Sequence, residues 1–337
     1  MNTPTKQGGL LKPALMLVLG LAMIGGAYVL ATKSSRDAEA LRQQQEAEMK
    51  QRRAAFLASE VPKLLDEEEK RNLAAERRAR KLLDEIFRAY EARVPEFVEE
   101  MTRFGMKVEL AKAAVKDWWS GSNEARNLAT GLFEEKVVSD AKLKADLIRV
   151  VSQFASDLAA SRNQIVSDLT NRVSTLAVPT AAGTYDPSKV AAEFEQKLQL
   201  LIEQRAVQAP AITLLSFGGG LVVQEATQAL VTSLLRGLAA RLGTLAVARR
   251  GAVAAGAGAG ALAGPVGIAA GLAIGLAIDV LMEKQFREKL TRECTAILAE
   301  MKLAVQGQQR EEFTRLISTT RELHEVALKT IIVGGNP

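Results

Sequence analysis

Few residues in this sequence have the type and spacing that catalysis or metal binding requires. The chain has one histidine, His324, and one cysteine, Cys294. A single histidine excludes every catalytic or metal site that needs two, and a single cysteine excludes a disulfide within the chain. Carboxylates alone could hold Mg²⁺ or Ca²⁺, but no acidic cluster has the ligand spacing of such a site. We therefore predict no metal and no cofactor.

Two stretches resemble phosphate-binding motifs in a superficial way. Residues 26–34, GAYVLATKS, end in Lys-Ser, but they lack the glycine before the lysine and do not follow a strand. Gly258, Gly260 and Gly264 lie in an Ala-Gly run, not at a strand-to-helix turn. The sequence also contains no nucleophile elbow, zinc-ligand pair or acidic calcium loop. These observations predict a protein that is not an enzyme.

The most regular spacing belongs to glycines in residues 251–278, a run without any charged side chain. The run exceeds the roughly 20 residues that a helix needs to cross a bilayer. On a helix these glycines share one face, so a second helix could approach closely, as helices do in lipid. Asp279 continues that face by one turn, and we expect it to act as an acid at the membrane edge. The predicted helix-contact stripe comprises Gly256, Gly260, Gly264, Gly267, Gly271 and Gly275.

Pro265 divides this run, and two interpretations follow. In the first, residues 251–282 form one kinked span. In the second, Gly264 and Pro265 form the tip of a helical hairpin, whose arms of about 20 Å are too short to cross a bilayer of roughly 30 Å. Such a hairpin would dip into lipid or lie inside a helical bundle. It resembles the apolar hairpins of alpha-helical pore-forming toxins and colicins, and the resemblance, which covers this stretch alone, implies membrane insertion.

The composition indicates the elements that position these residues. The chain is 48% hydrophobic, 25% charged and only 4% aromatic, which is typical of long helices. Acids and bases are closely mixed and the formal charge is +5, so one-signed patches of the kind that bind nucleic acid are not expected. The basic excess suits an anionic lipid surface. We predict an all-α fold with the lipid bilayer as a partner, together with further copies of the chain or a helical partner protein, and no nucleic acid.

A polar tail, residues 1–13, precedes an uncharged segment that we assign as a transmembrane anchor, residues 14–32. About 18 uncharged residues are just enough for a spanning helix. A signal peptide cleaved after Ala31 and a buried soluble helix are the alternatives. Basic residues are almost balanced across the segment, and the terminal amine favours an N-terminus on the inside. We therefore expect a plasma or inner membrane protein with a single N-terminal anchor and its bulk on the outer (periplasmic) side.

Residues 33–105 are predicted to form a charged, coiled-coil-like stalk. Acids and bases three or four residues apart fill residues 67–85, a pattern typical of a solvated helical face. Pro62, after a possible cap at Ser59, and Pro95 should each start or kink a helix. Glu68 and Arg71 interrupt the apolar seam of this stalk. The seam itself comprises Leu57, Val61, Leu64, Leu82, Ile86, Tyr90, Val94, Phe97, Met101 and Phe104.

Residues 106–176 are predicted to form a long-helix bundle. Trp118 and Trp119 stand at an apparent helix end, where we favour a core plug between two helices over contact with lipid head groups. The following helix, residues 139–176, would be roughly 55 Å long and needs a partner along its length. That partner could be the preceding helix, the following helix or another subunit. Its apolar face comprises Leu143, Leu147, Val151, Phe154, Leu158, Ile165, Leu169 and Val173.

The rest of the chain divides into a linker (residues 177–186), a helical segment (187–250), the glycine-stripe membrane segment (251–282) and C-terminal helices (283–337). Asp186 and Pro187 predict a helix start. Residues 221–235 are a weak candidate for a membrane span, and a buried amphipathic helix is favoured because Glu225 would be costly near the centre of a bilayer. Gly307 is expected to break the C-terminal helix. We interpret Cys294 as a core residue and His324 as a packing or surface residue.

Two hypotheses for the function follow from these segments. The first is a membrane-anchored, self-associating helical scaffold, or a structural component of a membrane complex, without catalysis. The second is a pore-forming or membrane-inserting protein that uses residues 251–282, with the glycine stripe lining a channel. The uncharged segment near the N-terminus favours the scaffold, because a released toxin should not carry a permanent anchor.

Overall fold

The computed structural model describes residues 11–120, 124–175, 187–206, 214, 221–249 and 283–333. For residues 11–35, 118, 187–188, 221–223, 243–249 and 283–284 it describes the backbone alone. Within these ranges the chain forms helices and no strand, which confirms the predicted all-α class. The helices are α1 (Leu11–Glu91), α2 (Val94–Thr102), α3 (Phe104–Ser120), α4 (Glu124–Lys136), α5 (Asp140–Thr175), α6 (Pro187–Ala206), α7 (Leu221–Arg249) and α10 (Glu283–Val333).

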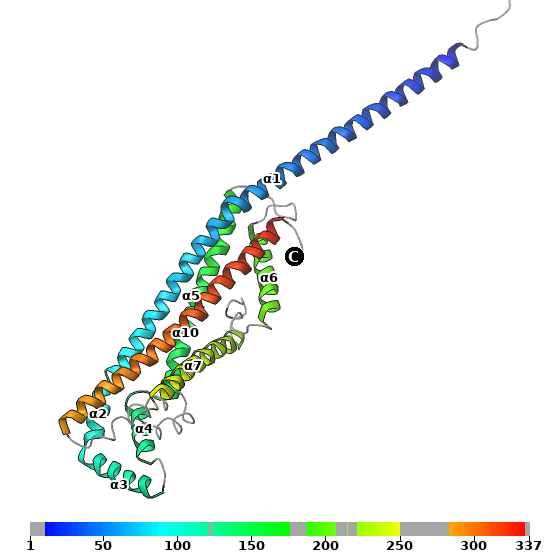
Figure 1. The fold of residues 1–337 in the computed structure, drawn as a ribbon. Coiled ribbons are helices and arrows are strands. Elements are labelled where there is room, and N and C mark those ends of the chain that lie inside the picture. The colour runs from blue at the N-terminus through cyan, green and yellow to red at the C-terminus, as the bar shows by residue number, and fades with distance from the viewer. Residues whose placement is uncertain are drawn as a thin grey trace, which may run out of the picture.

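Helix α1 is a single helix of 81 residues, about 120 Å long at 1.5 Å per residue. Its N-terminal part projects away from the other helices (Figure 1), and no residue from Arg36 to Ala55 is buried. From Phe56 onward α1 packs against α5 and α10. The solvated stalk expected over residues 33–105 is therefore wrong for residues 56–91, because their apolar face lies in the core and several of their charged side chains pair with neighbouring helices.

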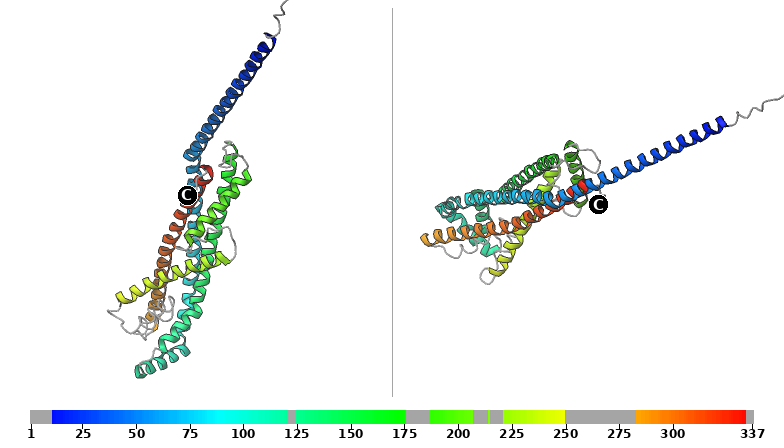
Figure 2. Two further views of the ribbon diagram at one scale, coloured as in Figure 1. Left: turned by 90° about the vertical axis from the view of Figure 1, so that its right-hand side faces the viewer. Right: turned by 90° about the horizontal axis from the view of Figure 1, so that it is seen from above.

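Helix α1 runs through Pro62 and does not start there. Pro62 is exposed between buried Val61 and Leu64, so water can reach the carbonyl that lacks its helical partner. The axis of α1 does change direction where it enters the bundle (Figure 2). Ser59 caps nothing, because its hydroxyl donates to the carbonyl of Ala55 at 2.9 Å. Pro95 lies in the first turn of α2, which confirms the helix start predicted there.

Helices α1, α5 and α10 lie side by side and form the bundle (Figure 1). Helix α5 contacts α1, α6 and α7, so the helix that follows it and the more distant α1 both supply the partners that its length requires. Its bounds agree with the predicted 139–176, and the backbone N–H of Lys142 donates to the Ser139 hydroxyl at 3.2 Å. The rings of Phe154 and Phe313 stack at 3.8 Å between centroids and join α5 to α10. All eight residues of the predicted α5 face are buried.

Helix α10 is continuous over 51 residues, so the break expected at Gly307 is wrong. A methyl group at Gly307 would lie 2.9 Å from Nη2 of Arg241 in α7, and one at Gly237 of α7 would lie 2.7 Å from Oε1 of Gln308. A long side chain of the partner helix thus lies over each glycine, and this packing outweighs the low helix propensity of glycine, about 1 kcal/mol. Helix α7 itself buries one face over residues 226–242, as an amphipathic core helix should.

Several predicted segments lie outside the described residues. They include the linker 177–186 and the whole of the glycine-stripe segment 251–282, with all six stripe glycines and Asp279. The anchor 14–32 lies in the part of α1 whose side chains the structure does not describe. Among the residues that it does describe, no helix combines the length and the apolar character that crossing a membrane requires.

Candidate functional site

Acidic side chains of α1 between Glu60 and Glu69 form ion pairs with one arginine of α5 and one arginine of α10. Arg172 of α5 donates to Glu60 at 2.8 Å and to Glu67 at 2.9 Å. Arg321 of α10 donates to Asp66 at 2.8 Å and also binds Glu69. Hydrogen bonds from Lys63 and then Arg172 lower the pKa of Glu60 below its ordinary value. The charges that the sequence suggested were solvated therefore make interhelical contacts.

Between these contacts, a carboxylate and an imidazole meet inside the bundle. Nδ1 of His324 in α10 lies 2.7 Å from Oε1 of Glu68 in α1, and their side chains are 1% and 2% exposed. Neither atom reaches the angular geometry of a hydrogen bond. Two bare lone pairs at this distance would repel, so we infer that one of these two atoms, Nδ1 or Oε1, carries a proton. The ring of Phe194 in α6 covers the imidazole edge-on, with centroids 5.5 Å apart.

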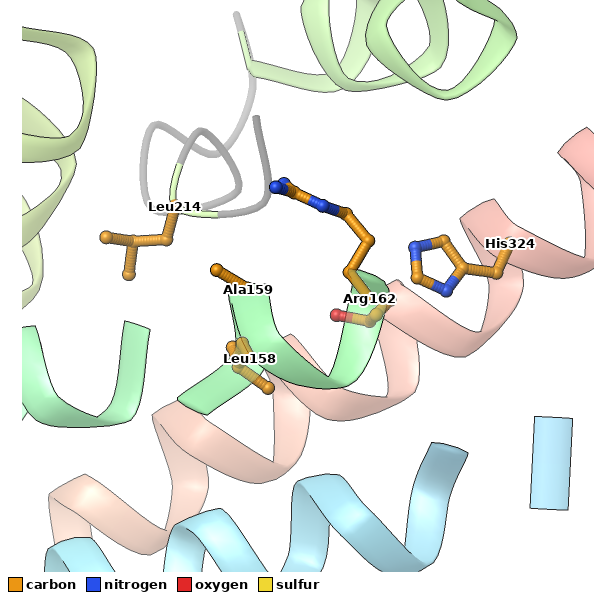
Figure 3. Close-up of a pocket in the computed structure, with 6 residues that line it drawn as sticks. Leu158, Ala159, Arg162, Leu214 and His324 are labelled. Carbon is orange, nitrogen blue, oxygen red and sulfur yellow. The ribbon is translucent and has the colours of Figure 1, made fainter. Parts of the chain in front are cut away.

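A small cavity adjoins His324 (Figure 3). The space open to water centres is about 10 Å³, which is room for one water molecule and far below the size of an organic-ligand pocket. Arg162 of α5 reaches along its wall, and burial lowers the pKa of this guanidinium while Glu195 opposes the shift. The described lining comprises Leu158, Ala159, Arg162, Leu214, Thr320 and His324.

This arrangement joins helices and does not form a substrate site. The cavity beside His324 has room for one water molecule and none for a second reactant. Among the described residues, no group of three or more His, Cys, Asp or Glu side chains could hold a metal ion. Cys294 lies elsewhere in α10, where burial and then Glu293 raise its thiol pKa to about 12. We therefore interpret the ion pairs of Arg172 and Arg321, together with the contact between Glu68 and His324, as a polar layer that fixes α1 against α5 and α10.

Sequence reasoning located parts of this layer without connecting them. His324 is expected to be a packing or surface residue, and the structure buries it in the core. Glu68 was treated as a weakness in the α1 seam, and the structure gives it the imidazole as a partner. A charged residue within an otherwise apolar seam was thus the available signal, although nothing local indicated its partner.

A second feature lies at the tip of the bundle, in α3. The core plug expected at the tryptophans is wrong for Trp119, whose side chain is 78% exposed; the side chain of Trp118 lies outside the described set. Phe104, the expected end of the stalk seam, is 82% exposed. Asp117 instead caps the next helix, since its carboxylate accepts the backbone N–H groups of Glu124 at 2.7 Å and Ala125 at 3.0 Å.

No protein-family model, curated protein or solved structure matches this chain significantly. The function must therefore be argued from the residues and their arrangement.

Proposed function

We propose that this protein is a membrane-anchored, self-associating helical scaffold without catalysis. The observation that carries the proposal is the continuity of α1, which extends from Leu11 to Glu91 without interruption. The uncharged segment 14–32 thus belongs to the same helix as the residues packed in the bundle. Between residue 33 and the first buried residue, Phe56, the helix has a length of about 35 Å. A helix of this kind would hold the bundle at a set distance from the bilayer.

The ion pairs of α1 support a rigid connection between anchor and bundle. Arg172, Arg321 and His324 each contact carboxylates of α1 from a neighbouring helix. Because α1 is part of the core, a displacement of the bundle would be transmitted to the anchor directly, not through a flexible tether. In this proposal the glycine stripe of residues 251–282 supplies the contact between copies within the membrane.

Membrane fractionation and protease protection test the proposal. We expect the full chain to stay with membranes after washes in high salt and in carbonate, and protease to reach a C-terminal tag from the outer side alone. Leu19→Arg with Ile24→Arg should release it, because each arginine at the centre of a spanning helix costs about 3 kcal/mol. Leu41→Arg, at an exposed α1 position, is the matched control and should change nothing. A chain that washes off and runs as a compact monomer without detergent would refute the scaffold.

Dye release from liposomes separates the scaffold from the pore-forming alternative. A scaffold should leave liposomes sealed. Leakage caused by the purified protein and abolished by Gly260→Leu with Gly271→Leu would favour a pore, because those substitutions would block the close helix contacts around a channel.

A further inference from the structure

Helix α3 carries apolar side chains on two opposite faces. On the inner face, Met106 and Leu110 are partly buried and pack against the core. The outer face follows steps of three and four residues, which place its members on one side of the helix. It comprises Phe104 (82% exposed), Val108 (37%), Val115 (59%) and Trp119 (78%), with exposed Ala111 between them.

This outer face is a large exposed apolar surface for a single helix. Phe104 and Trp119 are each about four-fifths exposed, and aromatic side chains of this kind present about 150–250 Å² each. The two rings alone therefore present roughly 300 Å², comparable to the largest apolar patch of a typical monomer. A stable dimer would need about 800 Å² from each partner, which one stripe on a 17-residue helix does not supply.

The charges around this face are positive. Lys107 flanks the stripe on one side and Lys112 on the other, and among the described residues neither makes an ion pair. Lys116 lies beyond Lys112 and pairs with Glu124 at the start of α4. The acids of α3 point elsewhere: Asp117 caps α4, and Glu109 is about 140° around the helix from Phe104 at 100° per residue.

We propose that the outer face of α3 binds an anionic phospholipid surface. Phe104, Val115 and Trp119 would enter the boundary between head groups and acyl chains, and Lys107 and Lys112 would contact the phosphates. An amphipathic helix with aromatic residues on one face and lysines beside them binds membrane interfaces in this way. A second copy of the chain is the poorer occupant, because it would also place equal lysine charges against each other.

The position of α3 determines which lipid surface it could reach. Helix α3 lies at the end of the bundle opposite the projecting part of α1 (Figure 1). The helix from residue 33 to Glu91 measures about 90 Å. If the anchor holds one membrane, as the proposed function requires, α3 would meet a second lipid surface and the protein would bridge the two.

Vesicle capture tests the inference with the full chain. The protein is reconstituted into phosphatidylcholine vesicles, and fluorescent vesicles with or without phosphatidylserine are added before flotation. We expect capture of the phosphatidylserine vesicles alone, and this capture should weaken with added salt.

In a Trp118→Phe variant, emission from Trp119 should shift to the blue on capture. Phe104→Ser with Val115→Ser should reduce capture at least tenfold, as should Lys107→Glu with Lys112→Glu, because each lysine contributes about fivefold at an anionic surface.

Matched variants keep the result specific. Leu200→Ser with Leu303→Ser removes exposed apolar side chains elsewhere, Lys50→Glu with Lys144→Glu reverses exposed charges elsewhere, and both should capture normally. The inference would be overturned if neutral vesicles were captured equally well, or if protein that floats with its own vesicles captured none. It would also be overturned if the α3 variants lost cross-linked dimers and still captured vesicles. If the protein does not enter the first vesicles, the proposed function fails. The emission of Trp119 with added phosphatidylserine vesicles then decides the lipid contact alone.

Discussion

Nδ1 of His324 and Oε1 of Glu68 lie 2.7 Å apart inside the bundle, with almost no exposed surface. The contact joins the C-terminal helix to the helix that carries the proposed anchor. Removing one member would leave the other as a buried polar group without a partner, which is far more costly than replacing both by apolar side chains. Because single and double substitutions should differ in cost, a double-mutant cycle can measure the interaction between the two side chains.

We expect Glu68→Leu and His324→Leu each to lower the free energy of unfolding by about 3 kcal/mol. The double substitution should cost clearly less than the sum, because no polar group is then stranded. Urea unfolding in detergent, followed by far-UV circular dichroism, measures the cycle. Glu69→Leu, at a partly exposed ion pair with Arg321, is the control and should cost below about 1 kcal/mol. Strict additivity would show that the two side chains do not interact.

The buried thiol of Cys294 should make the free energy of unfolding fall at alkaline pH. Burial raises its thiol pKa from the ordinary 9.0 to about 12, so between these values the unfolded chain releases the proton while the folded chain holds it. The contribution of this thiol is therefore complete below pH 9 and is lost as the pH rises towards 12, with a slope on the order of 1 kcal/mol per pH unit. Cys294→Ala should unfold with a shallower pH dependence over that range. Equal slopes in the two proteins would contradict the assignment.

Replacing Gly131 of α4 or Gly307 of α10 by alanine should change the free energy of unfolding by different amounts. Gly131 in α4 is exposed, and a methyl group there would meet no atom within 4 Å. Gly131→Ala should therefore raise the free energy of unfolding by about 0.5–1 kcal/mol. Gly307→Ala should gain less, because its methyl group would force the Arg241 guanidinium to move. Thermal unfolding of both variants checks the order, and a larger gain at Gly307 would contradict the contact of the Arg241 guanidinium with Gly307.

The glycine stripe makes a prediction about assembly. Gly260→Leu and Gly271→Leu should abolish the oligomers captured by cross-linking in membranes, because a bulky side chain on this face keeps a second helix away. Gly258→Leu is the matched control, since residue 258 lies about 160° from Gly260 on a helix and should leave cross-linking intact. Oligomers that survive the stripe substitutions would remove these glycines from the contact.

The sequence by itself determined the helices and the faces that they bury. The bounds of α5, the start of α2 at Pro95 and the buried position of Cys294 all followed from local signals. Helical periodicity, proline positions and caps act within a few residues, so they can be recognised without knowing the neighbours. The anchor and the glycine stripe stay sequence predictions, because the side chains that would test them lie outside the described residues.

Only the tertiary structure decided which charges are solvated and which helices touch. A mixed run of acids and bases looks the same whether water or arginines from other helices neutralise it, so the pairing of Arg172 with Glu60 and of His324 with Glu68 could not be anticipated. For the same reason α10 continues through Gly307 and Trp119 faces outward. Each outcome depends on the rotation and neighbours of a whole helix, which are set by packing across the bundle and leave no signal in the adjacent residues.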